Sequence, residues 1–397
     1  MSTERLLQIS LIVIEGTALM LRRLMIILMT LVFNLLAIAL HSCTQVNPNT
    51  HAVQAGGSDI GKPSEKIQKV GELPRTGLSY SFQFINDREG WLVGGNDLWR
   101  TVNGGASWQL VYSSDDKVSQ IQKFEFLGPQ VGWLLRLNGL YTTEDGGTSW
   151  KKISLPSKLS GGELRDVHFL SGGMVGWLAG GIYSPRTRDE ILSGGFPNNT
   201  VSPDFDAVLY GCIFRTNDGG KTWSQQFISR KAGRFLAIHF LDTAHGIATG
   251  DVGIYHTATG GRQWTSADLT KECVDKQHSN FYEQHPVMAA FLDTNTGWLI
   301  YDDGYLVKTT DGGRSWCELV RLKETWPEGQ NIFFKEIYFD SLTHGWGLNG
   351  SGFIYEIEDC GKTWIRTNTD IRFEDMYFLD ANHGWVVSRD TLFRINF

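Results

Sequence analysis

The feature that most constrains this chain is a short turn sequence that recurs six times along it. In its clearest copy, residues 308–318 read KTTDGGRSWCE, a charged glycine turn followed three residues later by Trp316. Internal repeats spaced by about 40 to 50 residues are typical of propellers and solenoids. The repeat therefore predicts one array of similar units rather than several unrelated domains. The other copies are TVNGGASW (101–108), TTEDGGTSW (142–150), RTNDGGKTW (215–223), HTATGGRQW (256–264) and EIEDCGKTW (356–364).

Short apolar runs around each turn indicate strands. A Gly-Trp pair precedes each turn, in one unit as Gly246-Ile247, and a further pair, Gly384-Trp385, follows the last turn, so that the chain contains seven units. Before each pair lies a short run rich in aromatic and β-branched residues, such as KFEFL (123–127) and EIYFD (336–340). Runs of this length bounded by turn residues are typical of β-strands. Four strands in each of seven units predict an all-β fold, a seven-bladed β-propeller of four-stranded blades.

The turn itself resembles the Asp-box, also called the sialidase or bacterial neuraminidase repeat, with the pattern S/T-x-D-x-G-x-T-W. An aspartate in a turn accepts hydrogen bonds from backbone N–H groups, the glycines adopt positive φ, and the tryptophan buries a large apolar surface. We match Thr310 to the Ser/Thr of the pattern, one residue closer to the aspartate than expected. We interpret the boxes as structural rather than catalytic, which agrees with their drift at Asn103, Thr259 and Cys360. The predicted structural box residues are Asp145, Trp150, Asp218, Trp223, Asp311, Trp316, Asp359 and Trp364.

The seventh unit stops early. After Gly384-Trp385 the sequence runs VVSRDTLFRINF, which supplies three strands and no box. An incomplete blade would leave an unpaired strand edge, which folded proteins avoid. We therefore predict that residues 67–72 add the missing outer strand, so that an N-terminal strand closes the last blade of a propeller spanning residues 67–397.

Two stretches interrupt the regular spacing. The step from Trp150 to Trp223 contains residues 182–210, which carry Pro, Gly, Asn and mixed charges, and a milder interruption covers residues 266–287. Insertions in repeat proteins map to loops, and long loops are often functional. We predict insertions within blade three and before blade five.

The first 42 residues are predicted to be a signal peptide. Arg22 and Arg23 precede an apolar stretch, residues 24–40, which describes the basic and apolar regions of a secretory signal. The stretch ends in Leu-His-Ser-Cys, which resembles a bacterial lipobox in which Cys43 carries the lipid. An uncleaved membrane anchor is the alternative, because about 17 apolar residues approach the length that spans a bilayer.

Residues 43–66 follow as a polar segment rich in Gly, Pro, Asn and Ser. This composition is typical of a flexible linker and predicts a lipid-anchored tether. The start of translation also stays open between Met1, Met20 and Met25, because residues 1–19, with Glu15 inside an otherwise apolar run, fit neither a signal peptide nor a membrane anchor well.

Charge and cysteine content exclude several classes of protein. The net charge is −7, which argues against a dedicated nucleic-acid binder, whose footprint is basic. Beyond Cys43 the chain has four cysteines, whose three possible pairings the sequence does not rank. They show no CxxC or Cys/His spacing, so we expect no metal site and no cofactor. The four are Cys212, Cys273, Cys317 and Cys360.

A sialidase-like glycoside hydrolase is the alternative that the boxes suggest. Sialidases carry an N-terminal F/Y-R-I-P motif, whereas the similar run here, residues 393–396, is FRIN at the wrong end of the chain. Aspartates and histidines recur at one position of several units, which predicts turn caps rather than unique catalytic groups. A two-carboxylate glycosidase stays possible from sequence, but we predict no catalytic residue. The recurring residues are Asp242, Asp293, Asp340, Asp380, His245, His344 and His383.

The whole repeat is similar to another family. The form F-x5-G-W-x-V-G-x2-G-x-[IL]-x2-T-x-D-G-G-x-[ST]-W, seen at 84–108 and 126–150, resembles the photosystem II stability and assembly factors of cyanobacteria and plastids. The resemblance implies a non-enzymatic propeller that binds the D1 precursor and photosystem II assembly intermediates. It also implies an exported, lipid-anchored protein, on the lumenal side of the thylakoid or in the cell envelope, which we expect to be monomeric.

A partner-binding patch is expected near the insertions. Arg186 and Arg188 lie in the first insertion, and Arg230 and Arg234 lie in the adjacent run ISRKAGRF, residues 228–235. Arginine is favoured at interfaces because its planar fork donates several hydrogen bonds. Solvated loop charges are the alternative explanation for these arginines, and a cell-surface glycan- or peptide-binding module is a further alternative for the function.

Overall fold

The computed structural model describes residues 53–54, 66–75, 80–114, 120–159, 162–185, 207–269, 286–301, 304–321, 333–367 and 369–395. The chain divides into two compact units, Met1–Thr50 and His51–Phe397, and the described residues lie in the second. Cys43, Arg186 and Arg188 lie outside the described residues. Within the described ranges, no helix is both long enough and apolar enough to cross a bilayer.

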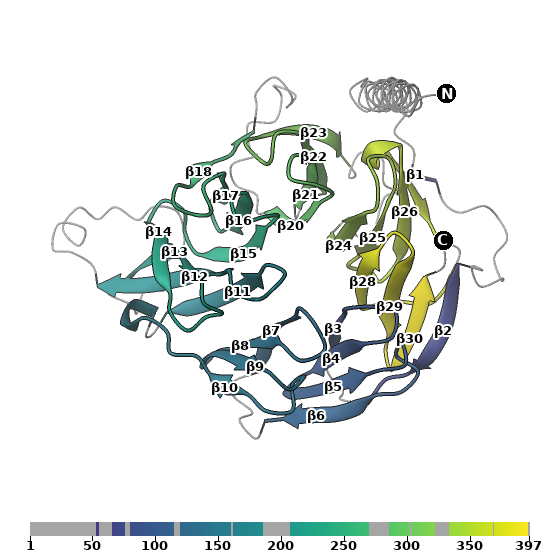
Figure 1. The fold of residues 1–397 in the computed structure, drawn as a ribbon. Helices are drawn as coiled ribbons and strands as arrows, with labels where there is room; N and C mark the ends of the chain where they lie inside the picture. The colour runs from purple at the N-terminus through teal and green to yellow at the C-terminus, as the bar shows by residue number, and fades with distance from the viewer. Residues whose placement is uncertain are drawn as a thin grey trace, which may run out of the picture. The chain divides into compact units, whose positions relative to one another are not determined.

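The described strands of the second unit form seven sheets around a common centre, which confirms the seven-bladed propeller (Figure 1). In each blade the first strand is innermost, and the inner strands of neighbouring blades contact one another. Blades one to three contain β3 (Tyr80–Phe84), β4 (Gly90–Gly94), β5 (Asp97–Thr101), β6 (Gln109–Ser113); β7 (Ile121–Phe126), β8 (Gly132–Arg136), β9 (Gly139–Thr143), β10 (Lys151–Lys152); β11 (Glu163–Phe169), β12 (Gly176–Pro185), β13 (Ala207–Thr216) and β14 (Ser224–Ser229). Blades four to six contain β15 (Phe235–Phe240), β16 (Gly246–Gly250), β17 (Gly253–Thr257), β18 (Thr265–Ser266); β20 (Pro286–Phe291), β21 (Gly297–Tyr301), β22 (Tyr305–Thr309), β23 (Ser315–Arg321); β24 (Phe334–Phe339), β25 (Gly345–Asn349), β26 (Ile354–Glu358) and β27 (Thr363–Arg366).

Blade seven joins the two ends of the propeller. It contains β28 (Asp375–Asp380), β29 (His383–Ser388) and β30 (Thr391–Ile395), and its outer strand is β2 (Ile67–Glu72). The β2 strand pairs antiparallel with β30, from Ile67 opposite Ile395 to Glu72 opposite Thr391. The predicted closure by residues 67–72 is therefore confirmed.

Two blades carry a fifth strand that the sequence did not predict. The short strand β1 (Val53–Gln54) pairs parallel with β27 of blade six, and β19 (Asp268–Leu269) pairs parallel with β23 of blade five. Part of the predicted insertion at 266–287 is thus an added strand. Likewise, the ends of the predicted insertion at 182–210 are not loop, because Ile182–Pro185 continues β12 and pairs with Ala207–Tyr210 of β13.

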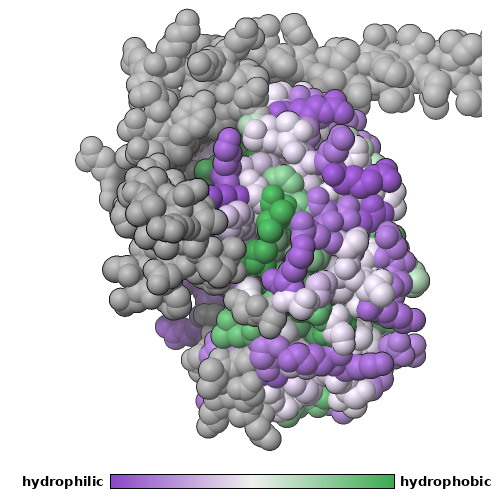
Figure 2. Space-filling view, turned by 90° about the vertical axis from the view of Figure 1, so that its left-hand side faces the viewer, coloured by the Kyte–Doolittle hydropathy of each residue, from purple (hydrophilic) through white to green (hydrophobic). Residues whose placement is uncertain are grey.

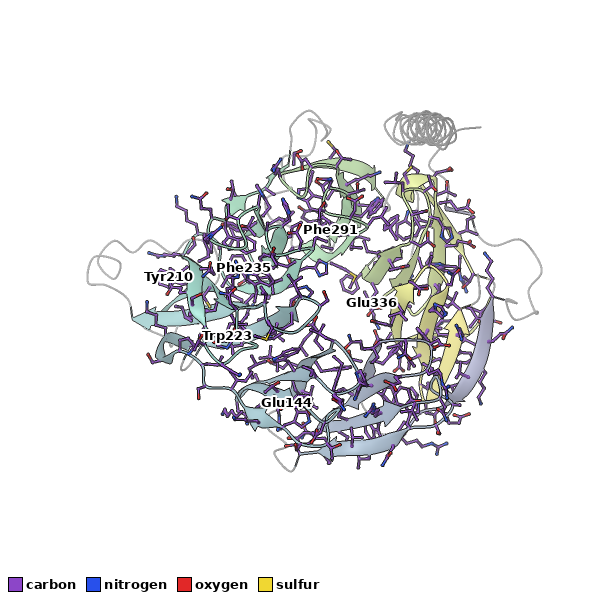
Figure 3. All side chains as sticks on the ribbon, in the orientation of Figure 1. Glu144, Tyr210, Trp223, Phe235, Phe291 and Glu336 are labelled. Carbon is purple, nitrogen blue, oxygen red and sulfur yellow. The ribbon has the colours of Figure 1, made fainter. Side chains whose placement is uncertain are left out.

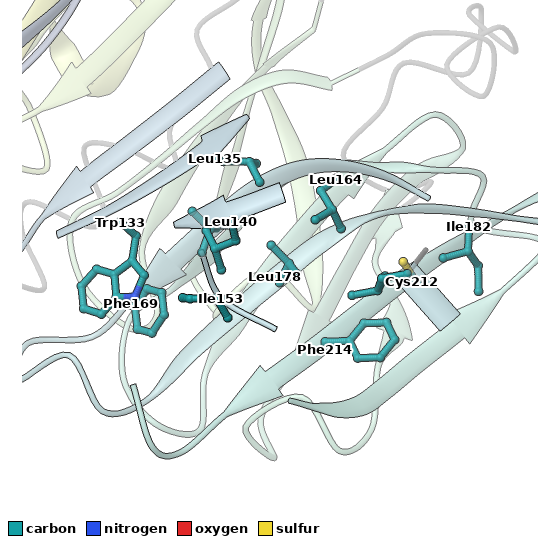
Figure 4. Packing of buried hydrophobic residues seen from close by; sticks show 12 residues of the cluster. Trp133, Leu135, Leu140, Ile153, Leu164, Phe169, Leu178, Ile182, Cys212 and Phe214 are labelled. Carbon is teal, nitrogen blue, oxygen red and sulfur yellow. The ribbon is translucent and has the colours of Figure 1, made fainter. Parts of the chain in front are cut away.

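Aromatic stacking between neighbouring blades holds the ring together. The tryptophan of a Gly-Trp pair stacks on the phenylalanine at the end of the next inner strand, as Trp91 does on Phe126 at 3.8 Å. Aliphatic side chains of both blades extend the contact, as between blades two and three (Figure 4). Each inter-blade surface is therefore a small apolar core. The other stacked pairs are Trp133–Phe169, Trp177–Phe240, Trp298–Phe339 and Trp385–Phe84.

The Asp-box turns join the third and fourth strands of a blade. In blade five, Asp311 accepts hydrogen bonds from the backbone N–H and the hydroxyl of Ser315, at 3.0 and 2.6 Å. Thr309, not Thr310, donates its hydroxyl to Asp311 and accepts the N–H of Gly313 at 2.9 Å. The match of Thr310 to the box pattern was therefore wrong, because the threonine two residues before the aspartate is the one that points into the turn. Blades two and three repeat this arrangement around Asp145 and Asp218.

The box tryptophans lie at two depths. Trp316 and Trp364 are fully buried, whereas Trp150 and Trp223 are partly buried. The indole N–H of each donates to the second glycine of its own box. In blade six, Asp359 and Cys360 both have positive φ, 50° and 64°, so that Cys360 takes the conformation that glycine has elsewhere.

Candidate partner-binding face

The two faces of the propeller have different connections. Because neighbouring strands in a blade are antiparallel, the turns between second and third strands lie at the same end as the links between blades. We call this end the insertion face, because the insertions leave β12 at Pro185 and follow β19 at Leu269. The Asp-boxes lie on the opposite end, the box face. The insertion face is therefore where the chain has added length beyond the minimal repeat.

Arg234 lies on the insertion face but its charge is paired. Its guanidinium contacts Glu163 of blade three at 3.0 Å and Asp251 of blade four at 3.2 Å, and its side chain is 30% exposed. Its backbone N–H also donates to Asp251. Arg234 thus joins two blades, and of the arginines predicted to bind a partner it is the one whose position favours a structural role.

Arg230 lies four residues earlier on the same link. Its carbonyl accepts the N–H of Gly233, which turns the chain towards β15. The structure therefore brings Arg230 and Arg234 onto one link, while Arg186 and Arg188 lie outside the described residues. A role for Arg230 in partner binding stays a prediction.

A groove of 760 Å³ opens on the insertion face of blades two and three. Its wall includes Leu137, Leu155, Pro156 and Leu164, and Lys152 lies at its side. Leu137, in the turn between β8 and β9, is 61% exposed. The sequence analysis missed this groove, because its residues come from a turn, a link and a strand with no common spacing.

The outer side of the propeller offers a less distinct surface. Figure 2 shows the side that lies at left in Figure 1, where hydrophilic residues cover much of the visible described surface around a narrow hydrophobic strip. Exposed large hydrophobic side chains occur singly, such as Ile228 on β14 and Leu110 on β6. Scattered apolar residues of this kind are normal on soluble surfaces.

Polar side chains at the centre form hydrogen bonds to the next blade. Gln83 donates to the carbonyl of Phe126 and accepts its N–H, at 3.0 and 2.8 Å. Glu125 accepts the N–H of Phe169, and His168 contacts the carbonyl of Phe240. Tyr377 closes this ring by donating to the carbonyl of Phe84 at 2.9 Å. These contacts satisfy the free edges of the inner strands, which would otherwise carry buried, unpaired backbone groups.

A second ring of contacts lies two residues earlier along the inner strands. Asp166 accepts the N–H of Ile238 and pairs with Lys123 at 3.0 Å. Glu336 accepts the N–H of Met376 at 2.9 Å and lies at the inner side of blade six (Figure 3). Burial and the neighbouring carboxylate of Asp375 raise the pKa of Glu336 well above its usual value. The carboxyl of Glu336 therefore keeps its proton to higher pH than an exposed glutamate does.

These central groups do not form a glycosidase site. The paired carboxyls of Glu336 and Asp375 are buried and engaged with the backbone of the next blade. In the same centre, burial lowers the pKa of His239 to about 3, so that it is neutral beside His168. Within the described residues, no group of three His, Cys, Asp or Glu side chains is arranged to hold a metal ion.

The recurring aspartates and histidines are turn caps, as predicted. Asp242 accepts the N–H groups of Ala244 and His245, and Asp293 accepts those of Asn295 and Thr296. The histidines contact the same aspartates: the ring nitrogens of His344 and His383 lie 2.5 and 2.7 Å from Asp340 and Asp380.

The structure shows the bonding state of three of the four cysteines beyond Cys43. Cys317 and Cys360 are disulfide-bonded, and Cys212 is free and buried between blades two and three. Cys273 lies outside the described residues. The disulfide-bonded cysteines lie in β23 and in the box of blade six, so that cross-linking occurs where the box departs from the glycine pattern.

The fold and its turns define the protein as an Asp-box β-propeller. Its central polar groups bond neighbouring blades to one another, and its box residues stabilise turns, so both have structural roles. Residues 62–186 match the family model described as photosynthesis system II assembly factor YCF48. The chain is also 27% identical over 338 residues to the photosystem II assembly protein Ycf48 of Thermosynechococcus vestitus (strain NIES-2133 / IAM M-273 / BP-1), covering 82% of each chain. These matches confirm the resemblance to the photosystem II assembly factor family that the repeats predicted.

Solved structures support the same fold. A structure described as YCF48 bound to D1 peptide superposes with a TM-score of 0.59 at 20% identity, covering 87% of this chain and all of that one. An ancestral GH74 enzyme superposes with a TM-score of 0.55 at 12% identity, covering 85% of this chain and 46% of that one. Because both likenesses are at low identity, they show the propeller alone.

Proposed function

We propose that this protein is a non-enzymatic assembly factor that binds a protein client during photosystem II biogenesis, with D1 or its precursor as the client. The observation that carries the proposal is the sequence match: residues 62–186 of this chain match the family model, and the curated relative is covered to 82% of its length. The solved relative with a D1 peptide supports this choice of client. The structural use of the central carboxyls favours binding over hydrolysis.

The insertion face is the surface we propose for the client. It carries the groove beside Leu137 and the arginine link at 230–234, and both insertions begin there. A groove lined by apolar and polar residues, with Lys152 at its side, suits a peptide that has both apolar and acidic side chains. The box face is occupied by compact hydrogen-bonded turns of the kind found around Asp145 and Asp311.

We propose further that the protein is exported and lipid-anchored through Cys43. The supporting observations are the basic and apolar regions before Cys43 and the polar segment after it. A lipid anchor would place the propeller at the membrane surface, where a newly inserted membrane protein could be captured. Cys43→Ala should move the protein from the membrane to the soluble fraction, whereas an uncleaved membrane anchor would keep the variant in the membrane.

The first experiment is purification from native cells. The protein is tagged at its C-terminus, extracted in mild detergent and analysed by mass spectrometry for co-purifying proteins. Recovery of D1 together with early reaction-centre subunits, and not of mature photosystem complexes, is the expected result. Recovery of unrelated envelope proteins with no D1 would overturn the proposed client, and glycan-binding and hydrolysis assays would then test the alternatives.

A further inference from the structure

Two arginines on the insertion face share one aromatic ring. The guanidinium carbon of Arg366 lies 3.5 Å from the ring centroid of Phe353, and that of Arg372 lies 3.4 Å from the same centroid. The two carbons are therefore no more than about 7 Å apart, the sum of these distances. We call this arrangement the Phe353 clamp.

The clamp is built on fixed backbone. Phe353 ends the turn between β25 and β26, where its N–H donates to the buried side chain of Asn349 at 2.9 Å. Arg366 ends β27, opposite Tyr355 of β26. The link that carries Arg372 is held against the turn, since the N–H of Phe373 donates to the carbonyl of Gly352 at 2.8 Å. The backbone that carries Phe353, Arg366 and Arg372 is thus held by strand pairing and by hydrogen bonds of the turn and the link.

The clamp lacks an acidic partner. Within the described residues, no carboxylate lies within ion-pair distance of Arg366 or Arg372. Two other arginines that lie over rings do have an acceptor: Arg100, over Trp91, is 3.8 Å from Glu89, and Arg215, over Trp177, donates to the carbonyl of Gly260. Both guanidinium carbons lie close to the ring centre, so they occupy opposite faces of Phe353. The two like charges repel one another, and an anion at the ring edge that contacts both removes that repulsion.

We propose that the Phe353 clamp is a subsite for a carboxylate of the client protein. Arginine presents a planar fork that matches the two oxygens of a carboxylate, and stacking on a ring holds the fork in place while its edge stays free to donate. Arg372 is exposed and Arg366 half-buried, so an extended segment can reach both. The subsite rests on the proposed function, since it assigns chemistry to the same client-binding face.

The test uses the full-length protein and labelled peptides. Binding of a short fluorescent peptide with two adjacent glutamates is measured by anisotropy, against the same peptide with glutamines and against inorganic phosphate as competitor. We expect the glutamate peptide to bind at least tenfold more tightly than the glutamine peptide. Equal affinity of the two peptides, or displacement of the peptide by inorganic phosphate at low millimolar concentration, would overturn the assignment to carboxylates.

Variants test the residues. Arg366→Gln and Arg372→Gln should each lower affinity about five- to tenfold, and Arg366→Lys should lose most of this affinity although it keeps the charge. Arg314→Gln, in a box on the opposite face, is the control that should leave affinity unchanged. Unchanged melting temperatures would show that the ring is intact. Full binding by the doubly substituted protein would overturn the subsite.

A failure of the proposed carboxylate subsite can be distinguished from a failure of the proposed client. If the Arg366→Gln/Arg372→Gln protein still co-purifies the same photosystem proteins in wild-type amounts, the subsite is wrong and the client stands. If wild-type protein binds the glutamate peptide through the clamp but recovers no D1, the client is wrong and the subsite stands.

Discussion

Trp385 of blade seven stacks on Phe84 of blade one, with ring centroids 4.0 Å apart and planes 5° from parallel. The same Trp–Phe contact joins blades one and two, two and three, three and four, and five and six, but here it joins the last blade to the first. The neighbouring pairing of β2 with β30 acts within one sheet, whereas Trp385 and Phe84 act between sheets. Closure of the ring therefore has two independent parts.

Removal of this stacking should weaken the whole ring. Trp385→Ala empties a fully buried site, for which we expect a loss of about 3–5 kcal/mol in the free energy of unfolding. Leu110→Ala, at a side chain that is 51% exposed, is the control and should cost less than about 0.5 kcal/mol. Urea unfolding followed by tryptophan fluorescence measures both. A loss below 1 kcal/mol for Trp385→Ala would show that blades one and seven close without the stack.

The two threonines of the fifth box should differ sharply. The Thr309 hydroxyl is buried and bonds both Asp311 and the N–H of Gly313, so Thr309→Ala leaves a buried donor unsatisfied and should cost about 1–3 kcal/mol. Thr310 is exposed, and Thr310→Ala should have little effect. The measurement is a pair of thermal unfolding curves. Equal effects of the two substitutions would contradict the hydrogen-bond assignment within the box.

The buried carboxyl pair predicts a definite pH dependence. The usual pKa of 4.5 for Glu336 is raised by burial and by Asp375 in the folded protein. At pH values above the ordinary pKa of 4.5 and below the raised pKa, the folded protein binds more protons than the unfolded chain. The free energy of unfolding therefore falls as pH rises through this range. Glu336→Gln removes this ionisable group. When the free energy of unfolding is measured from pH 4 to pH 8, the difference between variant and wild type should shift in favour of the variant as pH rises. An unchanged difference across this range would sink the prediction.

Asp145 should contribute a pH dependence of stability opposite in sign to that of Glu336. Hydrogen bonds from Ser149 lower the pKa of Asp145 from 3.8 to about 2 in the folded protein. The stability it contributes is present above pH 4 and is lost as pH falls through about 2. Asp145→Asn should therefore be less stable than wild type at pH 5 and approach it at pH 2. Unfolding curves at several acidic pH values check this difference.

Reduction should loosen the contact region of blades five and six. Cys317 and Cys360 are disulfide-bonded, and loss of a native disulfide typically costs about 2–4 kcal/mol. Cys317→Ser and Cys360→Ser should lower stability in non-reducing buffer and make it insensitive to reductant. If the two cysteines are joined to one another, the double variant should be no less stable than either single one. Additive losses would show that each is bonded elsewhere.

The sequence predicted the features that repeat. Seven blades, the closing strand at Ile67–Glu72 and the structural role of the boxes all follow from periodic signals, because each blade solves the same packing problem. The position of Thr309 was missed by one residue, since two adjacent threonines match the pattern almost equally and only the direction of the side chain separates them.

Features that occur once could not be predicted. The ion pairs of Arg234 are an example: Glu163 and Asp251 lie 71 and 17 positions away from it along the chain and come together only in the folded ring. The Phe353 clamp and the groove beside Leu137 likewise combine a turn, a strand end and a link from different parts of a blade. No spacing along the chain marks such combinations.

The pairing of β2 with β30 also means that the propeller can close only after the last strand has been synthesised. Glu72 and Thr391, which meet in blade seven, are 319 positions apart, so β2 is synthesised early and waits for nearly the whole propeller before its partner exists. A chain interrupted before β29 lacks both β30 and Trp385, so that β2 has no partner strand and Phe84 is uncovered. Quality-control proteases can recognise such an unfinished ring, while the completed one hides both signals at once.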